Sequence, residues 1–85
     1  MMFEKINKIV EERFLDGDYI SIRDKDGIHI SAVIEEMLAK DEAIAEYNVD
    51  YDETFDNPGC TIYYVSVAYI ENGELGHFTY IAEER

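Results

Sequence analysis

Hydrophobic and polar residues follow a helical period in the first segment of the chain. Phe3, Ile6, Val10 and Phe14 fall on one face at the 3.6-residue spacing of an amphipathic helix. Gly17 follows, and a glycine just beyond the last apolar residue is typical of a helix C-terminus, where it adopts the left-handed conformation. We therefore predict a first helix that ends before Gly17.

The next segment predicts a hairpin and a second helix. Residues 19–23 and 28–30 alternate apolar with polar side chains on either side of the turn Asp24–Gly27. Ser31 then occupies a helix N-cap position, because its hydroxyl can accept a hydrogen bond from a free backbone N–H. This helix is predicted from about residue 32 to about residue 47, on the spacing of Val33, Ile34, Met37, Leu38, Ile44 and Ala45.

The C-terminal third predicts a second hairpin, after a segment from Asn48 to Gly59 that we expect to be a loop. Asn72-Gly73 is the preferred dipeptide of a two-residue type I′ turn. This turn places Glu71 opposite Glu74 and so sets the register of the whole hairpin. One face then forms the core, with the ring of Tyr69 over Gly76; its members are Tyr63, Val65, Val67 and Tyr69 opposite Ala82, Tyr80, Phe78 and Gly76.

Together these elements predict one α+β domain over residues 1–85, in the order α-β-β-α-β-β. We expect a two-layer sandwich in which both helices cover one face of a four-stranded antiparallel sheet. The second sheet face is apolar enough to serve as a homodimer or partner surface, unless the long loop or the second helix covers it. Its apolar members are Tyr64, Ile70, Leu75 and Ile81.

Composition limits the partners. The chain has 20 acidic and 7 basic residues, a net charge of −13, so direct binding to nucleic acid or an anionic membrane is disfavoured by like-charge repulsion. Cys60 is the only cysteine and cannot form an internal disulfide, which suits a reducing cytoplasm. No stretch approaches the roughly 18 apolar residues of a membrane span.

The acidic residues are concentrated in the second half of the chain. Residues 41–85 contain eleven acids and one base, whereas residues 1–40 contain nine acids and six bases. We take the acid-rich segment from Asp41 to Asp56, with two glutamates upstream, as the candidate partner-binding site. Its residues are Glu35, Glu36, Asp41, Glu42, Glu46, Asp50, Tyr51, Asp52, Glu53, Phe55 and Asp56.

This run suggests mimicry of a nucleic-acid strand. Carboxylates one helical turn apart, or at alternate strand positions, are spaced by about 5–7 Å, close to the separation of successive phosphates. Such a surface could occupy a basic groove built for DNA or RNA, with Tyr51 and Phe55 as apolar anchors. Two other interpretations remain: an acidic adaptor with a different partner, and a charge that only improves solubility.

The residues give little support to catalysis or to a cofactor. The clusters around Asp24 and Asp50 lack the ligand spacing of an EF-hand. Cys60, His29 and His77 have no zinc-ligand spacing, and Cys60 begins a predicted strand, where a small buried residue is common. The five glycines stand singly, so there is no phosphate-binding loop. We expect no enzyme activity, no metal and no cofactor.

In size and charge the chain resembles phage- or plasmid-encoded inhibitors of defence nucleases, such as anti-restriction and anti-CRISPR proteins. The resemblance rests on composition alone, so it assigns a role to no residue. It implies a cytoplasmic protein that blocks the nucleic-acid groove of a basic nuclease or DNA-binding regulator. The alternative is a non-catalytic protein–protein interaction or regulatory module, which could form a homodimer through its second sheet face.

Overall fold

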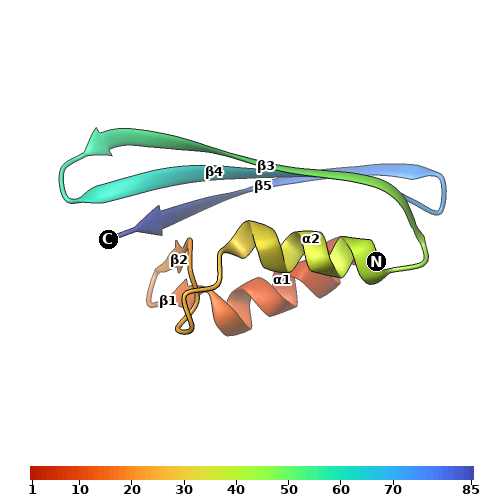
Figure 1. Cartoon of the computed structure of the whole chain (residues 1–85), viewed down its shortest axis with the longest axis horizontal. Helices are drawn as coiled ribbons and strands as arrows, with labels where there is room; N and C mark the ends of the chain where they lie inside the picture. The colour runs from red at the N-terminus through yellow and green to blue at the C-terminus, as the bar shows by residue number, and fades with distance from the viewer.

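The computed structural model describes residues 1–85, with side chains described for residues 1–54 and 58–85. Two helices cover one face of a five-stranded sheet (Figure 1). We call this the inner face and the opposite one the outer face. In chain order the elements are α1 (Met2–Arg13), β1 (Leu15–Asp16), β2 (Tyr19–Ser21), α2 (Ile30–Lys40), β3 (Ile44–Asn57), β4 (Cys60–Glu71) and β5 (Glu74–Glu84).

The α+β class and the two helices on one face agree with the sequence prediction, but the four-stranded antiparallel sheet was wrong. The strand order is β1-β2-β5-β4-β3. The sheet is mixed, because β2 pairs with β5 in parallel and the other neighbours are antiparallel. Two short N-terminal strands therefore extend one side of a long three-stranded meander.

The C-terminal hairpin confirms the predicted register. Glu71 pairs with Glu74, and the ladder continues with the expected partners to Tyr63 and Ala82. Asn72 and Gly73 have φ values of 51° and 81°, the positive angles that a type I′ turn requires. Tyr69 also covers the glycine, since a Cβ atom added to Gly76 would lie 2.3 Å from the Tyr69 Cζ.

The largest difference lies in the segment expected to be the end of a helix and a loop. α2 ends at Lys40, and residues 44–57 form β3, which pairs antiparallel with β4. Asp41 ends the helix because its extended backbone (φ −87°, ψ 119°) leaves the helical region. Its carboxylate then accepts a hydrogen bond of 2.9 Å from the Ala43 N–H.

The predicted N-terminal hairpin is also wrong. β2 pairs with β1 and β5, whereas His29 is the N-cap of α2 and Ile30 is its first residue. The two predicted arms meet only in one bridge between Arg23 and His29. Gly17 has a left-handed φ of 68°, as expected, but it lies in the turn between β1 and β2 because α1 already ends at Arg13.

The hydrophobic core lies between the helices and the inner face of the sheet. α1 contributes Met2 in place of the predicted Phe3, which is exposed. The Tyr80 hydroxyl links the sheet to α1 by donating a 2.9 Å hydrogen bond to Asn7 Oδ1. Burial raises the pKa of Tyr80 to about 12. The buried residues are Met2, Ile6, Val10, Phe14, Ile22, Ile30, Val33, Ile34, Leu38, Tyr63, Val65, Val67, Tyr69, Tyr80 and Ala82.

Candidate protein-binding surface

β3 carries acidic side chains on the outer face of the sheet. Its pairing with β4 determines the direction of each side chain, because partners in a ladder share a face. Residues opposite buried Tyr63, Val65, Val67 and Tyr69 face inward, and the alternate residues face outward. The outward residues of β3 include Glu46, Asn48, Asp50 and Asp52, all exposed.

Alternation along the strand sets the spacing of these outward residues. Outward residues two positions apart, such as Asp50 and Asp52, are separated by about 6–7 Å. The Asn48 side-chain amide donates a 3.0 Å hydrogen bond to Asp50 Oδ2. Asp50 and Asp52 therefore present two negative charges at a spacing comparable to that of successive phosphates. The neutral Asn48 leaves about twice that distance between Glu46 and Asp50.

Six of the seven lysines and arginines lie elsewhere, on the helix layer and its loops. Among the residues with described side chains, Arg85 is the only basic one in or after β3. It is held at the end of β5, where its guanidinium is 3.1 Å from a Glu83 oxygen and stacks 3.8 Å from the centre of the Tyr19 ring. No described basic side chain therefore interrupts the acidic row on β3.

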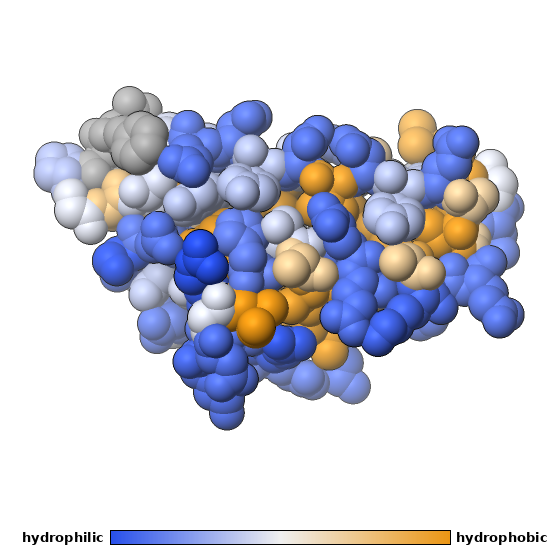
Figure 2. Space-filling view, viewed as in Figure 1, coloured by the Kyte–Doolittle hydropathy of each residue, from blue (hydrophilic) through white to orange (hydrophobic). Residues whose placement is uncertain are grey.

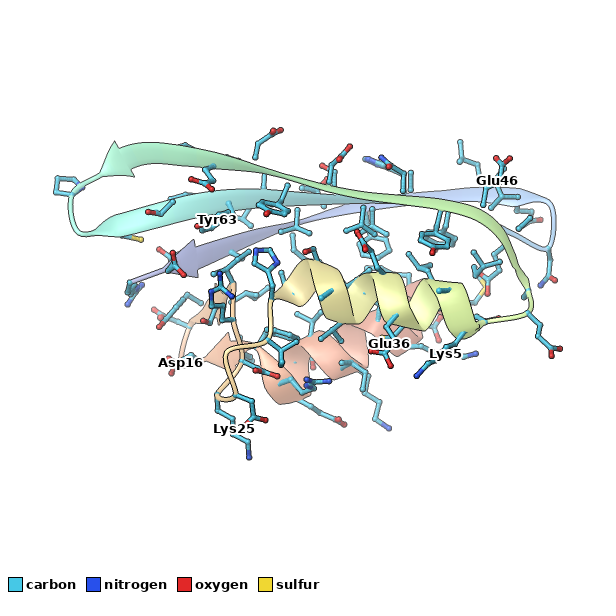
Figure 3. All side chains as sticks on the ribbon, in the orientation of Figure 1. Lys5, Asp16, Lys25, Glu36, Glu46 and Tyr63 are labelled. Carbon is cyan, nitrogen blue, oxygen red and sulfur yellow. The ribbon has the colours of Figure 1, made fainter. Side chains whose placement is uncertain are left out.

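The structure divides the predicted site between two layers. Glu35 and Glu36 lie on α2, and Glu36 forms an ion pair with Lys40. Figure 3 shows Glu36 on the helix layer and Glu46 on the far side of the sheet. The two helix glutamates therefore do not extend the acidic row on β3. They would have extended it if one helix had continued from residue 32 to residue 47, as the sequence predicted.

Asp41 and Glu42 belong to the connection between α2 and β3. Asp41 is partly buried and lies 3.3 Å from the Lys5 Nζ. The Ala43 N–H and the Lys5 ammonium lower the pKa of this carboxyl, so Asp41 is a structural residue of the turn. Glu42 is exposed.

Tyr51 and Glu53 lie on β3 but face inward, toward the N-terminus of α2. The Tyr51 ring is 4.6 Å from the His29 ring and 6.0 Å from the Tyr63 ring, measured between centroids. Tyr51 nevertheless remains 46% exposed. Tyr51 therefore lies on the opposite face of the sheet from Asp50 and Asp52. The side chains of the predicted anchor Phe55 and of Asp56 lie outside the described residues.

His29 caps α2 in place of the predicted Ser31. The Ser31 backbone N–H donates to His29 Nδ1 at 3.2 Å, and the Ser31 hydroxyl oxygen lies 2.7 Å from the same nitrogen. The Nδ1 atom can accept these bonds only while it carries no proton. Burial and the positive charge of Arg23 lower the pKa of His29, while Glu84 acts against them.

This cap predicts a loss of stability in mild acid. Because the folded state lowers the His29 pKa, the unfolded chain takes up the proton first, at about pH 6.5. The stabilisation is complete above that pH and is lost as the pH falls toward the folded-state value. Thermal unfolding should be measured at roughly pH 7.5 and pH 5.5. Between these values the melting temperature should fall more for the native chain than for His29→Asn, which keeps a capping oxygen that does not titrate. Equal falls would contradict the prediction.

The outer face of β4 and β5 is partly apolar and lies opposite the helices. Leu75 is 77% exposed and Ile81 58% exposed, with Tyr64 also exposed and Ile70 half-buried. α2 does not cover them, because the helices pack on the inner face (Figure 1). Residues 48–54 of the segment expected to be a loop lie beside β4 within the sheet. On the side of the molecule drawn in Figure 2, hydrophobic areas are divided by hydrophilic residues.

Asp24 and Cys60, two of the groups considered for metal binding or catalysis, already have side-chain partners. The Asp24 carboxylate accepts hydrogen bonds from the backbone N–H groups of Asp26 and Ile28 and lies 2.6 Å from Arg13 Nη2. Within the described residues, no three acidic, histidine or cysteine side chains are arranged to hold a metal. Partial burial and the Glu83 carboxylate raise the pKa of the Cys60 thiol, whereas a nucleophile needs the thiolate.

The chain was also compared with known proteins. No family model, curated protein or solved structure matches it. No described helix is long and apolar enough to cross a membrane. Inferences about function therefore rest on the geometry and charge of the surface.

Proposed function

We propose that the protein is a small non-catalytic inhibitor that occupies the nucleic-acid-binding groove of a basic protein partner, in the manner of anti-restriction and anti-CRISPR proteins. The observation that carries this proposal is the acidic row on β3, formed by Glu46, Asp50 and Asp52 on the outer face of the sheet. A basic groove built for a phosphate backbone attracts such a row and releases its own counterions on binding. The host cytoplasm is the compartment that we infer for this action.

A rigid strand supports this function better than the loop expected from the sequence. β3 is paired with β4 without interruption from Glu46 to Thr54, so the outward carboxylates keep their spacing before the partner arrives. Preorganisation lowers the entropy cost of binding. The proposed site is accordingly smaller than the predicted one, because Glu35 and Glu36 lie in the other layer and Asp41 supports the turn.

The test is capture of a partner from a lysate of host cells. We expect duplex DNA to elute a basic nucleic-acid-binding protein from the immobilised chain before salt is raised, since DNA and the acidic row compete for one groove. Affinity should also fall steeply with salt. A partner that stays bound through DNA and high salt, or an empty eluate, would contradict the proposal.

A second candidate function is favoured by the exposed apolar residues of the outer face. Leu75, Ile81 and Tyr64 could form a homodimer interface, because burial of apolar area drives association. Light scattering on a sizing column distinguishes this case: a dimer that Leu75→Asp converts to monomer supports it. A monomer at all concentrations excludes it.

A further inference from the structure

β3 lies at one end of the sheet and offers an open main-chain edge. Among the described strands its only neighbour is β4, and both helices pack on the inner face rather than along this edge. An edge strand has a row of backbone N–H and C=O groups that point away from its neighbour and can pair with another chain. At 14 residues, β3 also exceeds the usual strand length of about 3–10 residues.

The charges along this edge disfavour pairing with a second copy. A two-fold axis at Asp50 or at Asp52 would place that residue opposite itself, and an axis at Tyr51 would place Asp50 opposite Asp52. Like charges directly opposite one another destabilise a pair of strands. Lysine or arginine at the same positions would be attracted instead, so the edge is complementary to a basic strand.

The inner side of the same edge adds an independent preference for apolar residues. Tyr47 and Tyr51 face the helix layer but remain 44% and 46% exposed, because α2 covers only part of the strand. Half-buried Val49 lies between them. A strand added beside β3 would cover both rings with every second side chain, while the intervening side chains would meet Asp50 and Asp52 on the outer face.

We propose that β3 binds its partner by strand addition, pairing with an extended protein segment in which lysine or arginine alternates with apolar residues. The open edge provides the main-chain hydrogen bonds, and the two rows of side chains specify the alternation. This inference deepens the proposed function, on which it rests for the basic nature of the partner. It adds that the partner contributes a strand as well as a charged groove.

A synthetic peptide that alternates lysine and valine tests the proposal on the full chain. We expect it to bind and to slow hydrogen exchange of β3 amides that face away from β4. A second peptide of the same sequence, N-methylated at alternate residues along one edge, keeps the charge but loses donors. It should bind at least about tenfold more weakly, because each main-chain hydrogen bond contributes a factor of a few.

The outcomes separate this inference from the proposed function. Equal binding of both peptides without protection of β3, or no binding of either, would overturn strand addition and leave the lysate experiment to decide the groove proposal. Conversely, protection of β3 would support strand addition even if DNA eluted no partner. In the Asp50→Lys/Asp52→Lys variant, a glutamate–valine peptide should replace the lysine–valine peptide as the ligand; failure of this exchange would contradict the charge pairing.

Discussion

Reversal of two charges on β3, Asp50→Lys/Asp52→Lys, is expected to weaken binding to the basic partner by at least about a hundredfold. The two lysines would place like charge against the groove, and such contacts cost several kcal/mol, where about 1.4 kcal/mol corresponds to a factor of ten. Both side chains are exposed and face outward, so the domain should remain folded. Titration calorimetry against the captured partner, with circular dichroism of the variant, makes the measurement.

The chain offers a control with the same change in net charge. Glu12→Lys/Asp18→Lys replaces two exposed acids on α1 and in the β1–β2 turn, away from the outward row on β3. If the effect depends on the row, this variant should lose far less affinity. Equal losses in the two variants would show that net charge alone governs binding, and the acidic row would no longer be the site.

Truncation of one core residue, Phe14→Ala, is expected to lower the free energy of unfolding by about 3–5 kcal/mol. Phe14 is 1% exposed and closes the end of α1, where its carbonyl accepts a hydrogen bond of 2.7 Å from the Ser21 N–H. A domain of this length has a total stability of roughly 4–13 kcal/mol. The variant should therefore be close to unfolding, as urea denaturation followed by circular dichroism would show.

Phe3→Ala is the matched control because it also removes a phenylalanine side chain, from the first turn of α1 rather than from its C-cap. Phe3 is 42% exposed, although its ring is 4.9 Å from that of Phe78. We expect Phe3→Ala to lower the free energy of unfolding by much less than Phe14→Ala does. The pair also distinguishes the two assignments of the helix face, since the sequence pattern placed Phe3 and Phe14 together in the core. Equal losses would contradict the observed packing.

The elements that the sequence predicted correctly have strong local signals. Asn72-Gly73 determines a turn type, and that turn determines the register of β4 with β5 without any long-range information. The core face of this hairpin followed directly. For α1 the helical period was predicted correctly. Met2 and Phe3 are adjacent apolar residues, and tertiary packing rather than the local sequence determines that Met2 is the buried one.

β3 was missed although its signal was present. Tyr47, Val49 and Tyr51 alternate with Asn48, Asp50 and Asp52, which is the period of a half-buried strand. Aspartate has low strand propensity, and the acidic content favoured the interpretation as a loop. Pairing with β4 outweighs that propensity. The parallel contact of β2 with β5 joins residues about sixty positions apart, and no local pattern of a single sequence encodes such a contact.

The sorting of charge between the two layers affects the kinetics of association. The described lysines and arginines before β3 lie on the helix layer and its loops, and the acidic row lies on the outer face of the sheet. This charge distribution gives the molecule an electric dipole directed from one layer to the other. The field of a positively charged partner exerts a torque on this dipole, which turns the acidic β3 side toward the partner before contact. Fewer encounters are then wasted on wrong orientations, and association can exceed the roughly 10⁵–10⁶ M⁻¹s⁻¹ of unsteered pairs.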